Sequence, residues 1–288
     1  MIDAHHHLWD LDAVHYPWLM AQGVERFFGN PAPFQRNYLL SEFTRDARAQ
    51  GFSASVHIQV GAEDHLAEAL WVQQVAEDNP DWPMVQVPFC DLTASDFTDK
   101  LDQLQALSTV RGVRQIVGRA PGEDAITGTN ELLDDPAFVQ GLIEIGQRGL
   151  SFDLQLLPEL MNKTAQVLAR TPETRVVVCH AGSPHDRSTD GLAAWAEALH
   201  ALSDLPNVSC KLSGLGMFDH GWTAESIRPI VETVLAQFGA DRVMFGSNFP
   251  VDSLSSDYAT LVSAMRSLVL EDMHQAVFHD TAARFYGF

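Results

Sequence analysis

The sequence has few basic residues for its size. Its 288 residues include 18 Lys and Arg against 38 Asp and Glu, which gives a formal net charge of −20 at pH 7. Nucleic acids and anionic membranes are bound by basic surfaces, so this balance argues against both as partners. A small-molecule substrate, hydroxylated or anionic and held by a few local cations, is compatible with it.

Cysteines and long apolar segments are also scarce. The three cysteines are Cys90, Cys179 and Cys210, and no Cys-X-X-Cys pair occurs, so neither a disulfide framework nor a thiolate zinc site is predicted. No run of about 20 apolar residues is present, and the N-terminal segment has acid and histidine where a signal peptide has basic and then apolar residues. We therefore expect a cytoplasmic protein without a membrane span.

Short apolar runs alternate regularly with helical segments along the chain. Such alternation is typical of βα units, and eight units predict one distorted (β/α)8 TIM barrel domain over residues 1–288. A doubly wound sheet is the alternative, but no Gly-X-Gly-X-X-Gly or P-loop motif follows any strand. The expected strands are Met1–His7, Ala54–Val60, Met84–Phe89, Val110–Val117, Ser151–Leu156, Arg175–His180, Val208–Leu212 and Arg242–Phe245.

Capping residues, proline and glycine mark the expected helix boundaries. Ser41 is the expected cap of a helix that ends at Gly51, and Pro136 opens a helix that ends before Gly149. A longer insertion, about residues 8–40, follows the first strand and would lie over the active-site end of a barrel. Its aromatic residues include Trp9, Tyr16, Trp18, Phe27, Phe28 and Phe34.

Side chains two residues apart on a strand share a face, and this parity gathers polar residues. We expect these residues to point into the barrel near its carboxyl-end rim, with apolar residues of the other parity packed against the outer helices. By this rule Asp3 shares a face with His5 and His7, and Ser55, His57 and Gln59 share another, opposite to Val56 and Ile58. Further candidates at strand ends are Arg114, Gln155, His180, Lys211 and Asn248.

His5 and His7 form a His-X-His pair on the first expected strand. Their backbones would be about 6.6 Å apart on one face, so both imidazoles can converge on one ion. His180 is the third candidate ligand, whereas His6 has the opposite parity and is expected to be structural. The set predicts one divalent metal ion, with zinc the best match to imidazole. Catalysis without a metal is the alternative.

Arg114 and Lys211 are cations at strand ends in a chain with few of them. They could bind a substrate carboxylate or polarise a carbonyl, and Gln59 and Gln155 are expected to bind substrate beside them. The alternative is an ion pair with a neighbouring acid such as Asp153. Arg111 and Arg119, which flank the same strand, could replace Arg114 in this role.

Four segments taken in order resemble one family. They are residues 2–9 (IDAHHHLW), 179–184 (CHAGSP), 210–215 (CKLSGL) and 244–252 (MFGSNFPVD), and the tail at 278–286 also fits. The set resembles the amidohydrolase superfamily, in its amidohydrolase-related branch, which includes sugar lactonases such as the L-fuconolactonases and the 2-pyrone-4,6-dicarboxylate lactonases.

The resemblance implies a distorted barrel that hydrolyses a lactone to its hydroxy acid at the carboxyl-end rim. It implies that His5, His7 and His180 are the positions that bind metal in the wider superfamily. It also implies that Arg114 and Lys211 contact substrate oxygens. Within this branch some members bind one metal ion and others work without any.

The sequence departs from the family pattern at two positions. Gln155 stands where the wider superfamily has a ligand histidine, which argues against a two-metal site. Asn248 stands where an aspartate usually takes a proton from water, and an amide cannot accept that proton. Asp252, four residues on, and His180 are the candidate replacements for this base.

The sequence therefore predicts a lactone hydrolase. One alternative is a metal-dependent decarboxylase of the same superfamily, which the missing base makes conceivable. A second alternative is a small-molecule binder without catalytic activity. Neither the substrate nor an oligomeric state is predicted.

Overall fold

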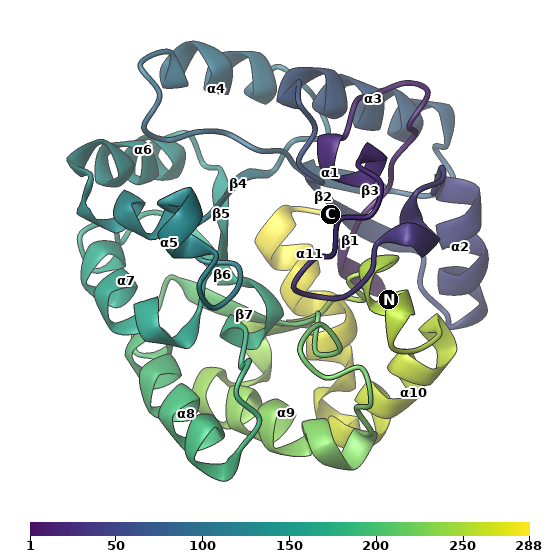
Figure 1. Ribbon diagram of the computed structural model, residues 1–288, viewed down its shortest axis with the longest axis vertical. Coiled ribbons are helices and arrows are strands. Elements are labelled where there is room, and N and C mark those ends of the chain that lie inside the picture. The colour runs from purple at the N-terminus through teal and green to yellow at the C-terminus, as the bar shows by residue number, and fades with distance from the viewer.

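Eight parallel strands form the centre of the molecule and helices surround them (Figure 1). The computed structural model describes residues 1–288, except for the side chains of residues 124 and 125. The predicted distorted (β/α)8 barrel is confirmed. The strands are β1 (Ile2–His6), β2 (Ala54–Ile58), β3 (Met84–Val87), β4 (Gly112–Ile116), β5 (Ser151–Gln155), β6 (Arg175–Val178), β7 (Val208–Leu212) and β8 (Val243–Phe245).

The barrel consists of two sheets that meet at irregular seams. One sheet has the order β1-β2-β3 and the other β4-β5-β6-β7-β8. Isolated parallel bridges, Gln86 with Val110 and Phe89 with Arg114, join β3 to the β4 side. At the other seam, the backbone N–H of Asn248 donates to the His5 carbonyl at 2.7 Å. This second seam brings two predicted site residues together.

Helices cover the outside of the barrel and its amino-terminal end. They are α1 (Pro17–Met20), α2 (Leu40–Ala49), α3 (His65–Asp78), α4 (Phe97–Gln105), α5 (Asp124–Thr127), α6 (Pro136–Gln147), α7 (Met161–Leu168), α8 (Thr189–Ser203), α9 (Ala224–Phe238), α10 (Tyr258–Leu268) and α11 (Thr281–Tyr286). Within the described part of the chain, none of these helices combines the length and apolarity needed to cross a membrane.

The expected helix boundaries are correct for α6 but not for α2. Pro136 is the first residue of α6, and the Asp135 carboxylate accepts from the Ala137 N–H at 2.8 Å as a cap. The α2 helix begins one residue before Ser41, with Leu39 at the cap position. Ser41 therefore lies inside the first turn and does not cap the helix.

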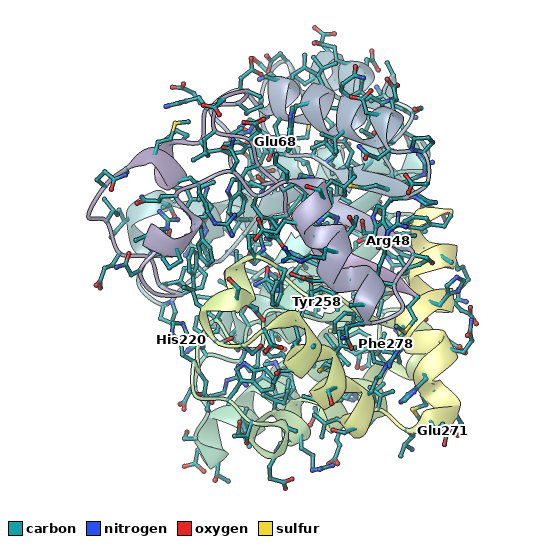
Figure 2. All side chains as sticks on the ribbon, turned by 90° about the vertical axis from the view of Figure 1, so that its right-hand side faces the viewer. Arg48, Glu68, His220, Tyr258, Glu271 and Phe278 are labelled. Carbon is teal, nitrogen blue, oxygen red and sulfur yellow. The ribbon has the colours of Figure 1, made fainter. Side chains whose placement is uncertain are left out.

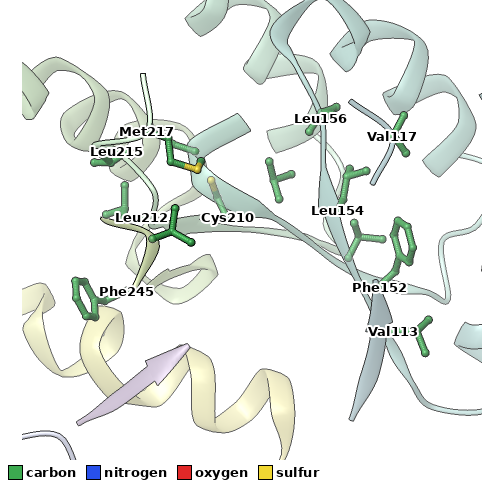
Figure 3. Packing of buried hydrophobic residues seen from close by; sticks show 14 of the residues in the cluster. Val113, Val117, Phe152, Leu154, Leu156, Cys210, Leu212, Leu215, Met217 and Phe245 are labelled. Carbon is green, nitrogen blue, oxygen red and sulfur yellow. The ribbon is translucent and has the colours of Figure 1, made fainter. Parts of the chain in front are cut away.

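Two apolar layers stabilise the barrel. The outer layer packs strand residues such as Phe152, Leu154 and Phe245 against the helices (Figure 3). The inner layer fills the amino-terminal half of the barrel, and α11, which lies at the centre of Figure 1, contributes to it. Its members are Ile2, Ala4, Ala54, Val56, Ile58, Val85, Val87, Val177, Met244, Ala282, Phe285 and Tyr286.

The inner layer corrects the predicted faces of β2. Val56 and Ile58 lie inside the barrel and not against the outer helices. Ser55, predicted to point inward, accepts a hydrogen bond of 2.9 Å from the Trp82 indole, a member of the outer layer. The predicted faces are therefore reversed within β2, although Gln59, just past its end, lines the cavity as predicted. The inward side chains of β2 are apolar because they fill the barrel below the cavity.

A register irregularity in β1 lies between Asp3 and His6. Asp3 accepts a hydrogen bond of 3.0 Å from the hydroxyl of Tyr258, on the outer helix α10 (Figure 2). The His5 ring lies instead 4.5 Å from the His180 ring, centroid to centroid. The prediction that Asp3 shares a face with His5 and His7 is thus wrong, because the bulge changes the parity.

Candidate active site

A cavity of about 300 Å³ opens at the carboxyl ends of the strands. This is the end at which barrel enzymes hold their catalytic residues. The insertion between β1 and α2 forms part of the wall through Trp9, Trp18, Arg26, Phe27 and Phe28. The predicted site residues that line the cavity are His7, Gln59, Arg114, Gln155, His180 and Asn248.

Three histidines cluster at the floor of the cavity, where His7 and His180 line it and the fully buried His5 is not among its described wall residues. The His5 ring centroid lies 5.1 Å from that of His7 and 4.5 Å from that of His180. Burial, with a further contribution from Arg114, lowers the pKa of His7 to about 4. Burial also lowers the pKa values of His5 and His180 well below 6.5. These shifts favour the neutral form of all three rings.

Hydrogen bonds fix two of these rings. His7 Nδ1 lies 2.8 Å from the Ile58 carbonyl, and its Nε2 lies 3.2 Å from Asn248 Oδ1. His180 Nδ1 lies 3.0 Å from the hydroxyl of Ser213, which leaves the Nε2 edge on the side of the cavity. His6, as predicted, is structural and stacks on Phe43 of α2.

The backbone at His180 and Asn248 is unusual. Both residues have a φ of 57°, in the left-handed region that non-glycine residues rarely adopt. Such strain often occurs at functional sites. Close packing accompanies it, because a side chain at Gly214 would collide with the His180 ring and one at Gly246 with His5. The glycines of the family-like segments therefore make room for the histidines.

Arg114 is held between two glutamine residues. Its guanidinium donates to Gln155 Oε1 and, at 3.4 Å, to the Gln59 carbonyl. The Arg114 Nε is buried and has no partner, and the same is true of Gln59 Oε1. Both residues line the cavity, and each keeps one side-chain atom without a hydrogen-bond partner.

Lys211 is a core residue in this structure. Its ammonium is fully buried, 2.6 Å from Asp153 Oδ2 and 2.7 Å from the Ala4 carbonyl. The Tyr286 hydroxyl donates to the same carboxylate at 2.9 Å. The ion pair considered as the alternative is therefore present, and Lys211 is not among the described residues of the cavity wall.

Asp252 lies behind Asn248 and not in the described cavity wall. Its Oδ1 accepts from the Asn248 side-chain amide at 2.8 Å, and its buried Oδ2 has no partner. Burial raises the pKa of Asp252 to about 7. Asp252 can thus orient Asn248, but Asn248 separates it from a bound ligand.

Two further arginines in the cavity wall are Arg26 and Arg119. Arg119 is one of the two predicted substitutes for Arg114. The other, Arg111, donates to the Ser108 carbonyl at 2.7 Å and is not among the described wall residues, and Arg26 was not predicted. The available signal was the position of Arg26 immediately before Phe27 and Phe28, in an aromatic insertion of a chain with few basic residues.

The histidine cluster offers nitrogens to a metal ion but not a complete set. Both ring nitrogens of His5 are buried without a partner, which an ion or a water molecule would satisfy. Both nitrogens of His7 already face oxygen atoms. Among the residues that the structure describes, no three His, Cys, Asp or Glu side chains are placed to hold one ion. The fit to a metal is partial, and the zinc site stays a prediction.

Comparison with known proteins places this arrangement in a family. The amidohydrolase family profile matches residues 2–288. The chain belongs to the amidohydrolase family. This membership agrees with the barrel fold and with the position of the cavity at the carboxyl ends of its strands.

Similar amidohydrolase-like chains come from two bacteria. The uncharacterized protein y4mH of Sinorhizobium fredii is 37% identical over 99% of this chain and 98% of its own. An L-fucono-1,5-lactonase of Burkholderia multivorans is 29% identical over 99% of this chain and 95% of its own. The solved structure of a B. multivorans amidohydrolase with bound zinc is 27% identical in sequence and has a TM-score of 0.81. The match covers 99% of this chain and 98% of the B. multivorans chain.

Proposed function

We propose that this amidohydrolase opens a small lactone to its hydroxy acid. One observation carries the proposal: Arg114, His180 and Asn248 line the same cavity. The lactonase named among the similar proteins supports this choice of reaction.

Arg114 supplies the electrostatic part of the reaction. The lactone carbonyl oxygen would accept a hydrogen bond from the Arg114 guanidinium, which polarises the carbon for attack. As water attacks, negative charge develops on this oxygen, and the guanidinium stabilises it more strongly than it stabilises the neutral lactone. Gln155 and the Gln59 carbonyl hold the guanidinium in place for this role.

His180 is the proposed general base. A neutral imidazole whose Nδ1 is bound to Ser213 can take a proton from water at Nε2. The water oxygen then bonds to the carbonyl carbon and forms a tetrahedral intermediate. When the ring C–O bond breaks, the proton passes from His180 to the departing alkoxide. The product is a hydroxy acid, and His180 returns to its neutral form.

Asn248 and Asp252 are proposed to orient the reacting groups. The Asn248 amide cannot remove a proton from water, but it can fix the water or the His7 ring by hydrogen bonds. Asp252 holds the amide from behind. A decarboxylase is the second candidate, because Asn248 in place of a base suits a reaction that needs no activated water.

The test is acid release from a panel of sugar, muconate-type and pyrone lactones. We expect turnover above the spontaneous rate on a subset of them, and a fall in kcat/KM of about 10²-fold or more in Arg114→Met and in His180→Gln. Arg45→Ala, at an exposed arginine paired with Asp46, is the matched control. Release of carbon dioxide without acid formation would favour the decarboxylase, and ligand binding without either product would favour a binder.

A further inference from the structure

Three arginines line the cavity of a strongly acidic chain. Arg26, Arg114 and Arg119 line it, and no Asp or Glu is among its described wall residues. The whole chain carries only 18 basic residues against 38 acidic ones. Carboxylates are the strongest acceptors for sugar hydroxyls, so their absence from this wall is unfavourable for a neutral, polyhydroxylated ligand.

Arg26 marks the outer part of the cavity. It is half-buried, whereas Arg114 on the floor is buried. Its guanidinium lies 5.7 Å from the centroid of the Trp18 ring, and its backbone pairs with Gly29 through two hydrogen bonds. The Arg26 Nε is buried without a hydrogen-bond partner. A guanidinium held in this way on the cavity wall can contact an anion through its terminal nitrogens.

Arg119 lies close enough to Arg26 for their charges to interact. Burial lowers the pKa of Arg26, and the Arg119 charge lowers it further, whereas Glu123 raises it. Arg119 forms an ion pair of 3.2 Å with Glu123. One carboxylate therefore serves two guanidiniums, and a second anion placed between them would relieve their repulsion.

The walls between the floor and this outer arginine pair are apolar. Trp9, Trp18, Phe28, Ile116 and Met217 all contribute to them. Such walls suit a flat or unsaturated ring, which buries apolar surface while its polar groups reach the two ends of the cavity.

From these observations we infer that the substrate is a lactone that carries a carboxylate. Its carbonyl is held at Arg114, and its carboxylate lies between Arg26 and Arg119. This inference rests on the proposed lactone hydrolysis for the carbonyl end, but the carboxylate site itself does not depend on turnover. Bidentate contact with a guanidinium is the preferred geometry for a carboxylate.

Binding of stable ring compounds tests the site without any reaction. The probes are isophthalate and its neutral match isophthalamide, titrated by calorimetry into the full chain. We expect isophthalate to bind at least tenfold more tightly, and Arg26→Ala and Arg119→Ala each to lose about tenfold or more of that affinity. Arg45→Ala should bind like the wild type. Equal affinity for the two probes, or an unchanged affinity in Arg26→Ala, would overturn the inference.

Kinetics separate this inference from the proposed function. A carboxylated lactone and its carboxamide should differ mainly in KM, and Arg26→Ala should raise KM for the carboxylated lactone alone. Hydrolysis of neutral sugar lactones with no preference for carboxylated ones would leave the lactonase intact and refute the carboxylate site. Tight isophthalate binding that depends on Arg26, without turnover of any lactone, would refute the lactonase and leave the site intact.

Discussion

The side-chain amide of Asn248 donates a hydrogen bond of 2.8 Å to the carboxylate of Asp252. Asn248 lines the cavity, and Asp252 is buried behind it. The carboxylate therefore lies behind the cavity wall, and the amide of Asn248 takes the position in the wall that a catalytic aspartate would occupy. This arrangement agrees with a cavity that presents arginine and histidine to its ligand.

Exchanging the side chains of Asn248 and Asp252 tests whether this hydrogen bond stabilises the fold. Asn248→Asp would place two buried carboxyl groups in contact, and because like charges disfavour ionisation, we expect a loss of about 1–3 kcal/mol of unfolding free energy at pH 8. The double variant Asn248→Asp/Asp252→Asn restores one amide and one carboxylate and should recover most of the loss. Urea denaturation measures both. A single variant as stable as the wild type would contradict the prediction.

Replacement of Lys211 should weaken the fold more than any surface lysine does. Lys211→Met leaves Asp153 buried without its cation, which we expect to cost about 3–5 kcal/mol. The double variant Lys211→Met/Asp153→Asn should be more stable than the single variant. Lys100→Met is the control, since the Lys100–Asp96 pair is exposed and should contribute less than about 1 kcal/mol. Equal losses in the two lysine variants, measured by urea denaturation, would be inconsistent with a core role.

Glu68 should make stability depend on pH. Its Oε1 accepts from the Val60 N–H at 2.8 Å, its Oε2 has no partner, and burial raises its pKa from 4.5 to about 7 (Figure 2). Because the pKa of Glu68 is higher in the folded protein than in the unfolded chain, the protonated carboxyl stabilises the fold. This contribution to the free energy of unfolding is complete below about pH 4.5 and is lost as the pH rises toward 7.

Glu68→Gln removes that dependence. Between pH 5 and pH 8 we expect the wild type to lose unfolding free energy relative to this variant. Glu63→Gln, at a side chain that is 72% exposed, is the control and should retain the wild-type slope. Parallel slopes for Glu68→Gln and the wild type would show that the carboxyl is not buried in its charged form.

Zinc binding should depend on His5. Because His5 has two unpartnered ring nitrogens, His5→Phe is expected to reduce zinc affinity at least tenfold in competition with a chromophoric chelator. His6→Phe is the matched control, since the ring nitrogens of His6 are also unpartnered but its ring stacks on Phe43 outside the cluster. Zinc held equally well by both variants would place the ion elsewhere.

The barrel could be predicted from the sequence because each βα unit carries its own signals. Apolar runs, prolines and glycines recur at the spacing of such units, and the residues that follow parallel strands must meet at one end. Arg114, His180 and Asn248 reach the cavity for this reason. Their positions follow from the order and direction of the strands. A prediction of this kind holds even when a strand boundary is wrong by two residues.

The faces of individual strands could not be predicted as well. Parity separates Val56 and Ile58 from Ser55 in β2, but parity alone does not say which set lies inside. Lys211 and Asp153 share the inward face, yet only their approach across the barrel shows that they bind each other. Arg26 reaches the cavity because the insertion folds back over the barrel, which no local pattern indicates.

The bulge between Asp3 and His6 sets the directions of two side chains. It lets Asp3 bind Tyr258 among the helices while His5, two residues on, meets His180 inside the barrel. A regular strand with the same number of residues would place Asp3 and His5 on one face, with either a carboxylate in the cavity or an imidazole against α10. At this point the bulge, more than the identity of the residues, determines where the histidines lie.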